Sequence, residues 1–138
     1  MEFEGLRLDV AEGLARLTFN DPARGNPIDG PLCASLCEAA IQLSENRNVR
    51  CVLVAAEGKV FSYGGDVGAF VADLADLSLN IKRWTTTLHS AISRFQRMDA
   101  PIVAPASSTS GVSPRCTRCA AAARPTGPAP ITTTGKVD

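Results

Sequence analysis

The chain has 138 residues, and its 14 basic and 14 acidic side chains give a formal net charge of zero. At this length one hydrophobic core is expected, and two complete domains are not. The balanced charge gives no reason to expect nucleic acid or an anionic membrane surface as a partner.

The N-terminus and the cysteines predict a cytoplasmic protein. The first residues, "MEFEGLRLDV", include acids and lack the basic start and continuous apolar core of a secretory signal. No apolar run approaches the length of a membrane span. The cysteines are Cys33, Cys37, Cys51, Cys116 and Cys119. An odd set without a secretory context favours reduced thiols over a disulfide scaffold.

Up to Ala104 the sequence has the pattern of an α/β domain. "FEGLRLDV" and "LARLTF" are short, partly alternating runs that predict a β-hairpin, and "NDPARGNP" consists of turn formers that predict a loop. A helix should follow, with Asp29 as its N-cap and Pro31 in its first turn. Its buried face is predicted to hold Leu32, Leu36, Ala39, Ala40 and Leu43.

The rest of this region predicts a strand, two helices and a further strand. The run "VRCVLVAA", residues 49–56, is nearly all apolar, as in a central strand covered on both faces. "DAPIVA" predicts another strand, with Pro101 at its first position. A short helix is indicated by Val67, Phe70, Val71 and Leu74, and a longer one, from about Asn80 to Met98, by a buried stripe of Ile81, Trp84, Leu88, Ile92 and Phe95.

The segment from Pro105 to Asp138 differs in composition. It contains no Leu, Phe, Tyr, Trp or Met and is dense in Ala, Thr, Pro and Ser. Such a segment cannot bury enough apolar area to offset the entropy of ordering it, so we expect a disordered tail over 105–138 after a domain over 1–104. One hypothesis is a reading-frame shift shortly after Ala104, which fails if neither alternative frame encodes a Gly-Gly-rich segment with an acid nearby.

A glycine motif, "GKVFSYGGDVGAF" at residues 58–70, follows the predicted central strand. Taken alone, "YGGD" is most simply a glycine turn ahead of a helix cap. Its neighbours change that interpretation. "LTFNDPARGNPID", a helix, "VRCVLVAAEGKVFSYGGDV", a helical region and "PIVA" occur in one order, and over residues 1–104 this order resembles the N-terminal part of the enoyl-CoA hydratase/isomerase family, the crotonase superfamily.

The resemblance implies a spiral of ββα units, assembled as homotrimers or as hexamers made of two trimers. Its members act on acyl-CoA thioesters, so coenzyme A enters with the substrate and no separate cofactor is expected. The chemistry passes through a thioester enolate, whose developing charge is stabilised by fixed backbone N–H donors.

The same resemblance assigns the site residues. In the family's Phe-Ser-x-Gly-x-Asp pattern, the residue before Asp supplies one of two oxyanion-hole N–H groups, and here that residue is Gly65. Gly64 lets the chain turn with no Cβ near the thioester, and Asp66 caps the next helix. Substrate contacts are also expected from Ser62, Tyr63 and Val67 in this motif, and from the backbone of Ala23, Arg24 and Gly25 on the opposite wall. Arg24 either meets a phosphate or is a solvated loop arginine.

The sequence also departs from the family pattern. Asp21 replaces the usual Arg, and Gly68 stands where many members have a phosphate-binding Lys. "PASSTSGVSPRCTRC" replaces the second glycine-rich segment, which supplies the other oxyanion donor, and no acid follows Asp99 except Asp138. Two functions remain open: a crotonase-type hydratase or isomerase, inactive as this chain, and a non-catalytic fragment that binds CoA or related subunits.

Two further features have simpler explanations. His89 is the only histidine, and a lone His on an amphipathic helix is more often a partly exposed packing residue than a catalytic base. "CTRC", residues 116–119, lacks the second ligand pair that a structural zinc site requires, so we expect no metal there.

Overall fold

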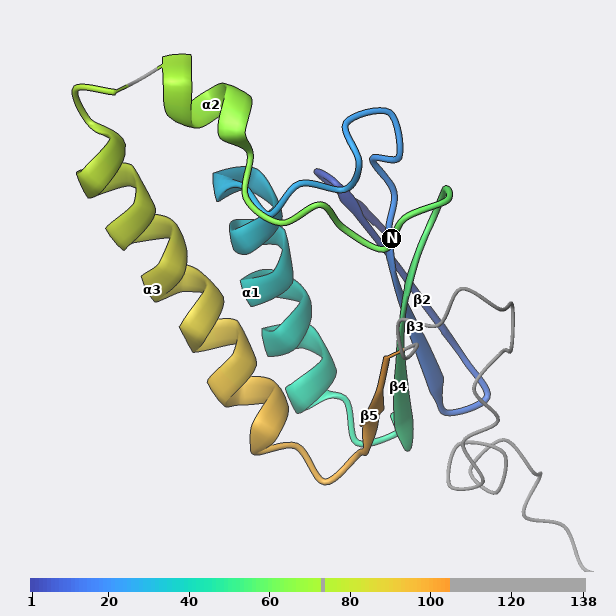
Figure 1. Ribbon diagram of the computed structural model, residues 1–138. Helices are drawn as coiled ribbons and strands as arrows, with labels where there is room; N and C mark the ends of the chain where they lie inside the picture. Colours follow the sequence, from blue (N-terminus) through green and yellow to red (C-terminus); the bar gives the residue numbers. More distant parts are fainter. Residues whose placement is uncertain (73, 105–138) are drawn as a thin grey trace, which may run out of the picture.

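The computed structural model describes residues 1–72 and 74–104 (Figure 1). This part forms one sheet with strand order β1-β2-β3-β4-β5. In chain order, the elements are β1 (Glu2–Phe3), β2 (Leu6–Ala11), β3 (Leu14–Phe19), α1 (Gly30–Glu45), β4 (Cys51–Ala56), α2 (Val67–Ala72), α3 (Leu77–Gln96) and β5 (Ile102–Val103). The predicted tail, with its "CTRC", lies outside the described residues.

The predicted hairpin is confirmed, with one difference at its start. β2 and β3 pair antiparallel from Leu6↔Phe19 to Ala11↔Leu14. Glu12 and Gly13 join them, and both have positive φ, as a tight two-residue hairpin turn requires. The first predicted strand is interrupted, because Gly5 turns the chain at φ +70° and β1 folds back onto β2.

The predicted α1 is confirmed at its start and on its buried face. The Asp29 carboxylate accepts a hydrogen bond from Leu32 N–H at 3.0 Å, and Pro31 lies in the first turn. All five predicted residues of the apolar face are buried, together with Cys33 and Ser35. They pack against Leu6, Leu8, Leu17 and Val52 of the sheet to form the core.

β4 is central, as predicted, but it is covered on one face more than on the other. It pairs parallel with both β3 and β5, and the two crossovers that connect these strands contain the helices. α1 and α3 run side by side on the same side of the sheet (Figure 1). No helix of the described residues covers the opposite face. Cys51 and Val52 of β4 are buried, and residues 53–56 are half-buried.

The face of the sheet opposite the helices carries polar residues on β2 and β3 and apolar residues on β4. Arg7 pairs across the strands with Thr18, and Asp9 with Arg16, so β2 and β3 present polar residues there. Arg7 also forms an ion pair with Glu57 at 2.7 Å. The same face of β4 carries Leu53 and Ala55. This face of the sheet is therefore polar over the hairpin and apolar over β4, and Thr18 and Cys51 are buried on it.

The two later helices are where predicted but more exposed than the pattern indicates. Ala91 is the buried residue of α3, and α2 has none among its described residues. Four members of the predicted stripe are half-buried, whereas Ile92 is 43% exposed. The prediction that this whole stripe is core is thus wrong, because α3 lies in the outer layer, where it packs mainly on α1 and its Trp84 stacks on Phe70 of α2. No helix in the described part of the chain has the length and apolarity needed to cross a membrane.

Candidate functional site

Two loops meet at the carboxyl ends of the parallel strands β3 and β4. Residues 20–29 leave β3, residues 57–66 leave β4, and a short parallel bridge pairs Ile28 with Gly65. Ile28 N–H donates to Gly64 C=O at 2.7 Å, and Tyr63 N–H donates to Gly25 C=O at 3.0 Å. The structure therefore brings together the two segments that the sequence predicts as opposite walls of one site.

Asn26 joins the loops from within and is a residue that the sequence analysis did not single out. Its side chain is buried, its Nδ2 donates to the carbonyls of Glu57 and Val60 at 3.0 and 3.1 Å, and its Oδ1 accepts from Asp21 N–H at 3.0 Å. Its φ of +52° is in the left-handed region, which Asn tolerates. The available signal was an Asn directly after Gly in a turn-rich loop.

Gly25 and Gly64 both require a backbone that other residues avoid. Gly25 has φ +78°, and a Cβ there would overlap the Tyr63 ring. Gly64 has φ +91°, and a Cβ there would meet nothing within 4 Å. Gly64 is thus needed for the turn itself, and the side of the chain that its Cβ would occupy is open.

Gly65 has an exposed backbone, and no described residue accepts a hydrogen bond from its N–H. A Cβ at this position would lie 2.9 Å from Cζ of Phe70, whose ring stacks on Trp84 with centroids 6.0 Å apart. Next to it, Ser62 Oγ donates to Asn26 C=O at 2.7 Å and accepts from Gly64 N–H at 3.0 Å. These contacts hold the loop around the exposed Gly65.

Asp66 caps α2, as the sequence predicts. Its Oδ1 accepts from Ala69 N–H at 3.0 Å. Val67 follows at the first position of the helix and is 68% exposed, and the Tyr63 side chain is 76% exposed. Ala23 is also exposed. These residues make no part of the core.

Arg24 is held by three carboxylates. Its Nε lies 2.6 Å from Asp21 Oδ2, and its Nη1 lies 3.1 Å from Asp29 Oδ2 and 3.2 Å from Asp66 Oδ2. The hydrogen bond to Asp21 is the largest cause that raises the pKa of Arg24, ahead of the bond to Asp29. Arg24 is thus a half-exposed loop arginine whose Nε and Nη1 already pair with protein carboxylates.

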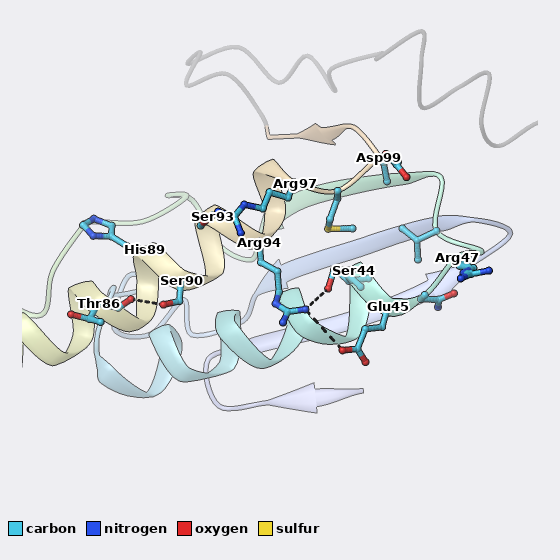
Figure 2. A pocket seen from close by; sticks show the side chains of 15 residues that line it. Ser44, Glu45, Arg47, Thr86, His89, Ser90, Ser93, Arg94, Arg97 and Asp99 are labelled. Carbon is cyan, nitrogen blue, oxygen red and sulfur yellow. Dashed lines mark hydrogen bonds and ion pairs between the residues drawn. The ribbon is translucent and has the colours of Figure 1, made fainter.

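A large cleft in the described part of the chain lies elsewhere. The void beside Arg24, Asn26 and Asp29 measures only about 10 Å³. A cleft of about 1040 Å³ opens between the C-terminal ends of α1 and α3, and none of the predicted site residues lines it (Figure 2). His89, predicted as a packing residue, is exposed and lines this cleft instead.

The described residues contain no cluster of side chains suited to bind a metal ion. Within residues 1–72 and 74–104, no group of three or more His, Cys, Asp or Glu side chains is placed to hold a metal ion. Cys33 and Cys37 are free thiols on α1. The arrangement thus offers one chemical feature, the amide of the exposed Gly65, fixed between two loops.

Residues 14–107 match a family model described as enoyl-CoA hydratase/isomerase. This match covers more than half of the chain, so the chain belongs to the enoyl-CoA hydratase/isomerase family. Its α/β sheet and helices have the crotonase-type fold: an enoyl-CoA hydratase from Mycobacterium smegmatis superimposes with a TM-score of 0.65 at 30% identity, over 72% of this chain and 38% of that structure.

Two curated relatives agree with this assignment. The trans-2-decenoyl-[acyl-carrier-protein] isomerase of Streptococcus mutans is 36% identical over 67 residues, which cover 49% of this chain and 26% of that protein. The mitochondrial enoyl-CoA hydratase domain-containing protein 3 of Xenopus laevis is 26% identical over 98 residues, 70% of this chain and 32% of that protein. The chain thus spans about a quarter to a third of these relatives.

Proposed function

We propose that the loop pair is half of an acyl-CoA thioester site, with Gly65 N–H as one oxyanion-hole donor. The observation that carries this proposal is the Gly65 amide, which is exposed, fixed by its neighbours and without an acceptor among the described residues. Membership of the enoyl-CoA hydratase/isomerase family supports the same reading.

The chemistry follows from the fixed position of this donor. Removing an α-proton from a thioester places negative charge on its carbonyl oxygen, and a donor that is already aimed at that oxygen need not reorganise. Losing one such donor costs about a hundredfold to a thousandfold in rate. Gly64 leaves open the side of the chain next to this amide, where the thioester would lie.

The coenzyme arm would run between the two loops. Ala23, Ser62, Tyr63 and Val67 are exposed or half-exposed on these loops and are available for contact. Arg24 contributes less than its charge indicates, because three carboxylates surround its guanidinium. We therefore expect backbone and apolar contacts to dominate binding, and phosphate pairing at Arg24 to be weak.

We further propose that the 138-residue chain does not turn over substrate by itself. A second oxyanion donor and a general base are both needed, and the sequence lacks the second glycine-rich segment. Three acids of this region are engaged: Asp21, Asp29 and Asp66 all pair with Arg24. A non-catalytic chain that binds CoA or associates with related subunits remains the alternative, and trimeric assembly and a cytoplasmic location belong to the proposal.

An assay with a 2-enoyl-CoA thioester tests both parts. Binding should appear as a selective shift of the Gly65 amide resonance in a titration, with no loss of the enoyl absorbance over time. Clear turnover by the unaltered chain would refute the inactive reading. Gly65→Pro removes the N–H and should abolish binding at this loop, whereas Arg50→Gln, at the far end of β4, should leave it unchanged.

A further inference from the structure

We infer that Arg24 is a positioning residue, which locks the starts of α1 and α2 together and thereby fixes the loop that presents the Gly65 amide. This inference rests on the proposed function for its catalytic meaning. Its geometric content, a link between two helix caps through one guanidinium, stands on the contacts of Arg24 alone.

The two caps are bound in the same way. Asp29 and Asp66 each use Oδ1 to accept a backbone N–H of the helix that follows, from Leu32 and Ala69 respectively, both at 3.0 Å. Each turns its Oδ2 toward the same atom, Arg24 Nη1, at 3.1 and 3.2 Å. One nitrogen thus joins two carboxylates whose helices belong to different crossovers.

The rest of the side chain ties this junction to the first loop. Nε donates to Asp21 Oδ2 at 2.6 Å, and the backbone N–H of Arg24 donates to Asp21 Oδ1 at 3.3 Å. Asp21 in turn accepts a hydrogen bond from Asn26 N–H at its carbonyl, and its own N–H donates to Asn26 Oδ1. The guanidinium therefore connects a rigid turn, the start of α1 and the start of α2.

The three carboxylates that pair with Arg24 are more buried than Arg24 itself. The side chains of Asp29, Asp66 and Asp21 are 8%, 22% and 24% exposed, whereas that of Arg24 is 50% exposed. An isolated exposed pair contributes little, but a network that shares one cation loses less side-chain entropy per contact. Guanidinium geometry suits this task, because its planar fork presents several donors at fixed angles and an ammonium does not.

The position of the junction gives it a role at the site. Asp66 directly follows Gly65, and α2 has no buried described residue, so the Phe70–Trp84 stack is the packing contact that the structure gives it. The loop after β4 is otherwise fixed by the hydrogen bonds of Ile28, Tyr63 and Ser62. Arg24 thus supplies the ionic contact that holds the C-terminal side of Gly65.

Amide hydrogen exchange followed by NMR tests this inference in the unliganded chain. Arg24→Gln should lower the protection of the Ile28 and Tyr63 amides by about threefold to tenfold, because local opening needs little energy once the link is gone. It should leave the Leu17 amide in β3 unchanged and shift the Gly65 amide resonance. Arg50→Gln is the matched control, since its side chain donates to the Glu12 carbonyl at 2.8 Å, in the hairpin turn and away from the two loops.

Asp66→Asn separates the link from the cap. Asn is as good an N-cap as Asp, so α2 keeps its cap while the ion pair is lost. If Arg24 acts through Asp66, the double variant loses no more protection than Arg24→Gln alone, and Arg24→Lys restores only part of it. Additive losses, equal losses at Leu17, or unchanged protection at Ile28 and Tyr63 would each overturn the inference.

The outcomes separate this inference from the proposed function. Absence of any acetyl-CoA binding by the unaltered chain would count against the proposed site and leave the exchange results intact. Binding that Arg24→Gln weakens only through local opening, in step with the exchange rates, supports both. Normal exchange in Arg24→Gln contradicts the positioning role whatever the chain binds.

Discussion

α1 and α3 are both predicted as amphipathic helices, yet they are buried to very different extents. α1 has 16 residues and buries seven of them, whereas α3 has 20 and buries only Ala91. α1 lies between the sheet and α3, while α3 lies in the outer layer, with α1 between it and the sheet (Figure 1). An apolar stripe therefore shows which face of a helix packs, and the number of neighbouring layers decides how deeply.

The N-terminus of α1 is also better capped than that of α3. The Asp29 side chain caps α1 through Leu32 N–H, but Asp76, at the equivalent place before α3, makes no side-chain capping bond. α1 begins in a loop that Asn26 and Arg24 hold in place. α3 begins after α2, among exposed apolar residues such as Leu74 and Leu79. The helix nearest the sheet, α1, is thus both the more deeply buried and the better capped of the two.

The largest expected effect compares two leucines. Leu43→Ala in α1 removes a side chain that is 2% exposed and should lower the free energy of unfolding by about 2–5 kcal/mol. Leu79→Ala in α3 removes one that is 46% exposed and should change it by less than about 0.5 kcal/mol. Urea titrations of the two variants measure both values, and equal losses would contradict the contrast between the helices.

A smaller effect is expected at the two caps. Asp29→Ala should destabilise the protein by about 0.5–2 kcal/mol, since the Leu32 N–H loses its acceptor. Asp76→Ala should be nearly neutral. Asp29→Asn retains an acceptor for the helix and loses only the charge facing Arg24. Its loss of stability should therefore lie between those of Asp29→Ala and Asp76→Ala. Thermal unfolding ranks the three, and a cost at Asp76 equal to that at Asp29 would refute the difference in capping.

The two free thiols of α1, Cys33 and Cys37, test the effect of burial within one helix. Burial raises the pKa of Cys33, and the nearby Asp29 carboxylate raises it further. A raised pKa means less thiolate at a given pH, so Cys33 should be alkylated more slowly than the half-buried Cys37. We expect the alkylation rates of the two thiols to differ by about tenfold or more at pH 8, and this difference should become smaller in denaturant. Mass spectrometry resolves the two sites, and equal rates in the folded chain would contradict the burial of Cys33.

Much of the fold could be predicted from local sequence. The alternation in "LARLTF", the Asp29 cap and the apolar spacing of α1 are properties of short segments, and each leads to one structure. The break after β1 was harder, because a glycine inside an alternating run can continue a strand or turn it. Only the positive φ of Gly5 decides between the two.

The candidate site was less predictable, because its contacts join segments distant in sequence. The motif around Gly64 and Gly65 was recognisable, and Asp66 behaves as a cap. The engagement of Arg24 by Asp29 and Asp66 depends on how two crossovers meet, and no local pattern contains that information. For the same reason Ile92 was assigned to the core: its place on the stripe was correct, but the neighbour that would cover it is absent from the described residues.

The parallel pairing of β4 has a consequence for the order in which the chain folds. The hairpin of β2 and β3 closes a two-residue loop, whereas β4 reaches β3 only after a crossover that contains α1, and β5 reaches β4 after a longer one with α2 and α3. Loop-closure entropy rises with each step. The hairpin and α1 are thus the natural folding nucleus, and β5, with two paired residues, should join after the transition state and influence mainly the rate of unfolding.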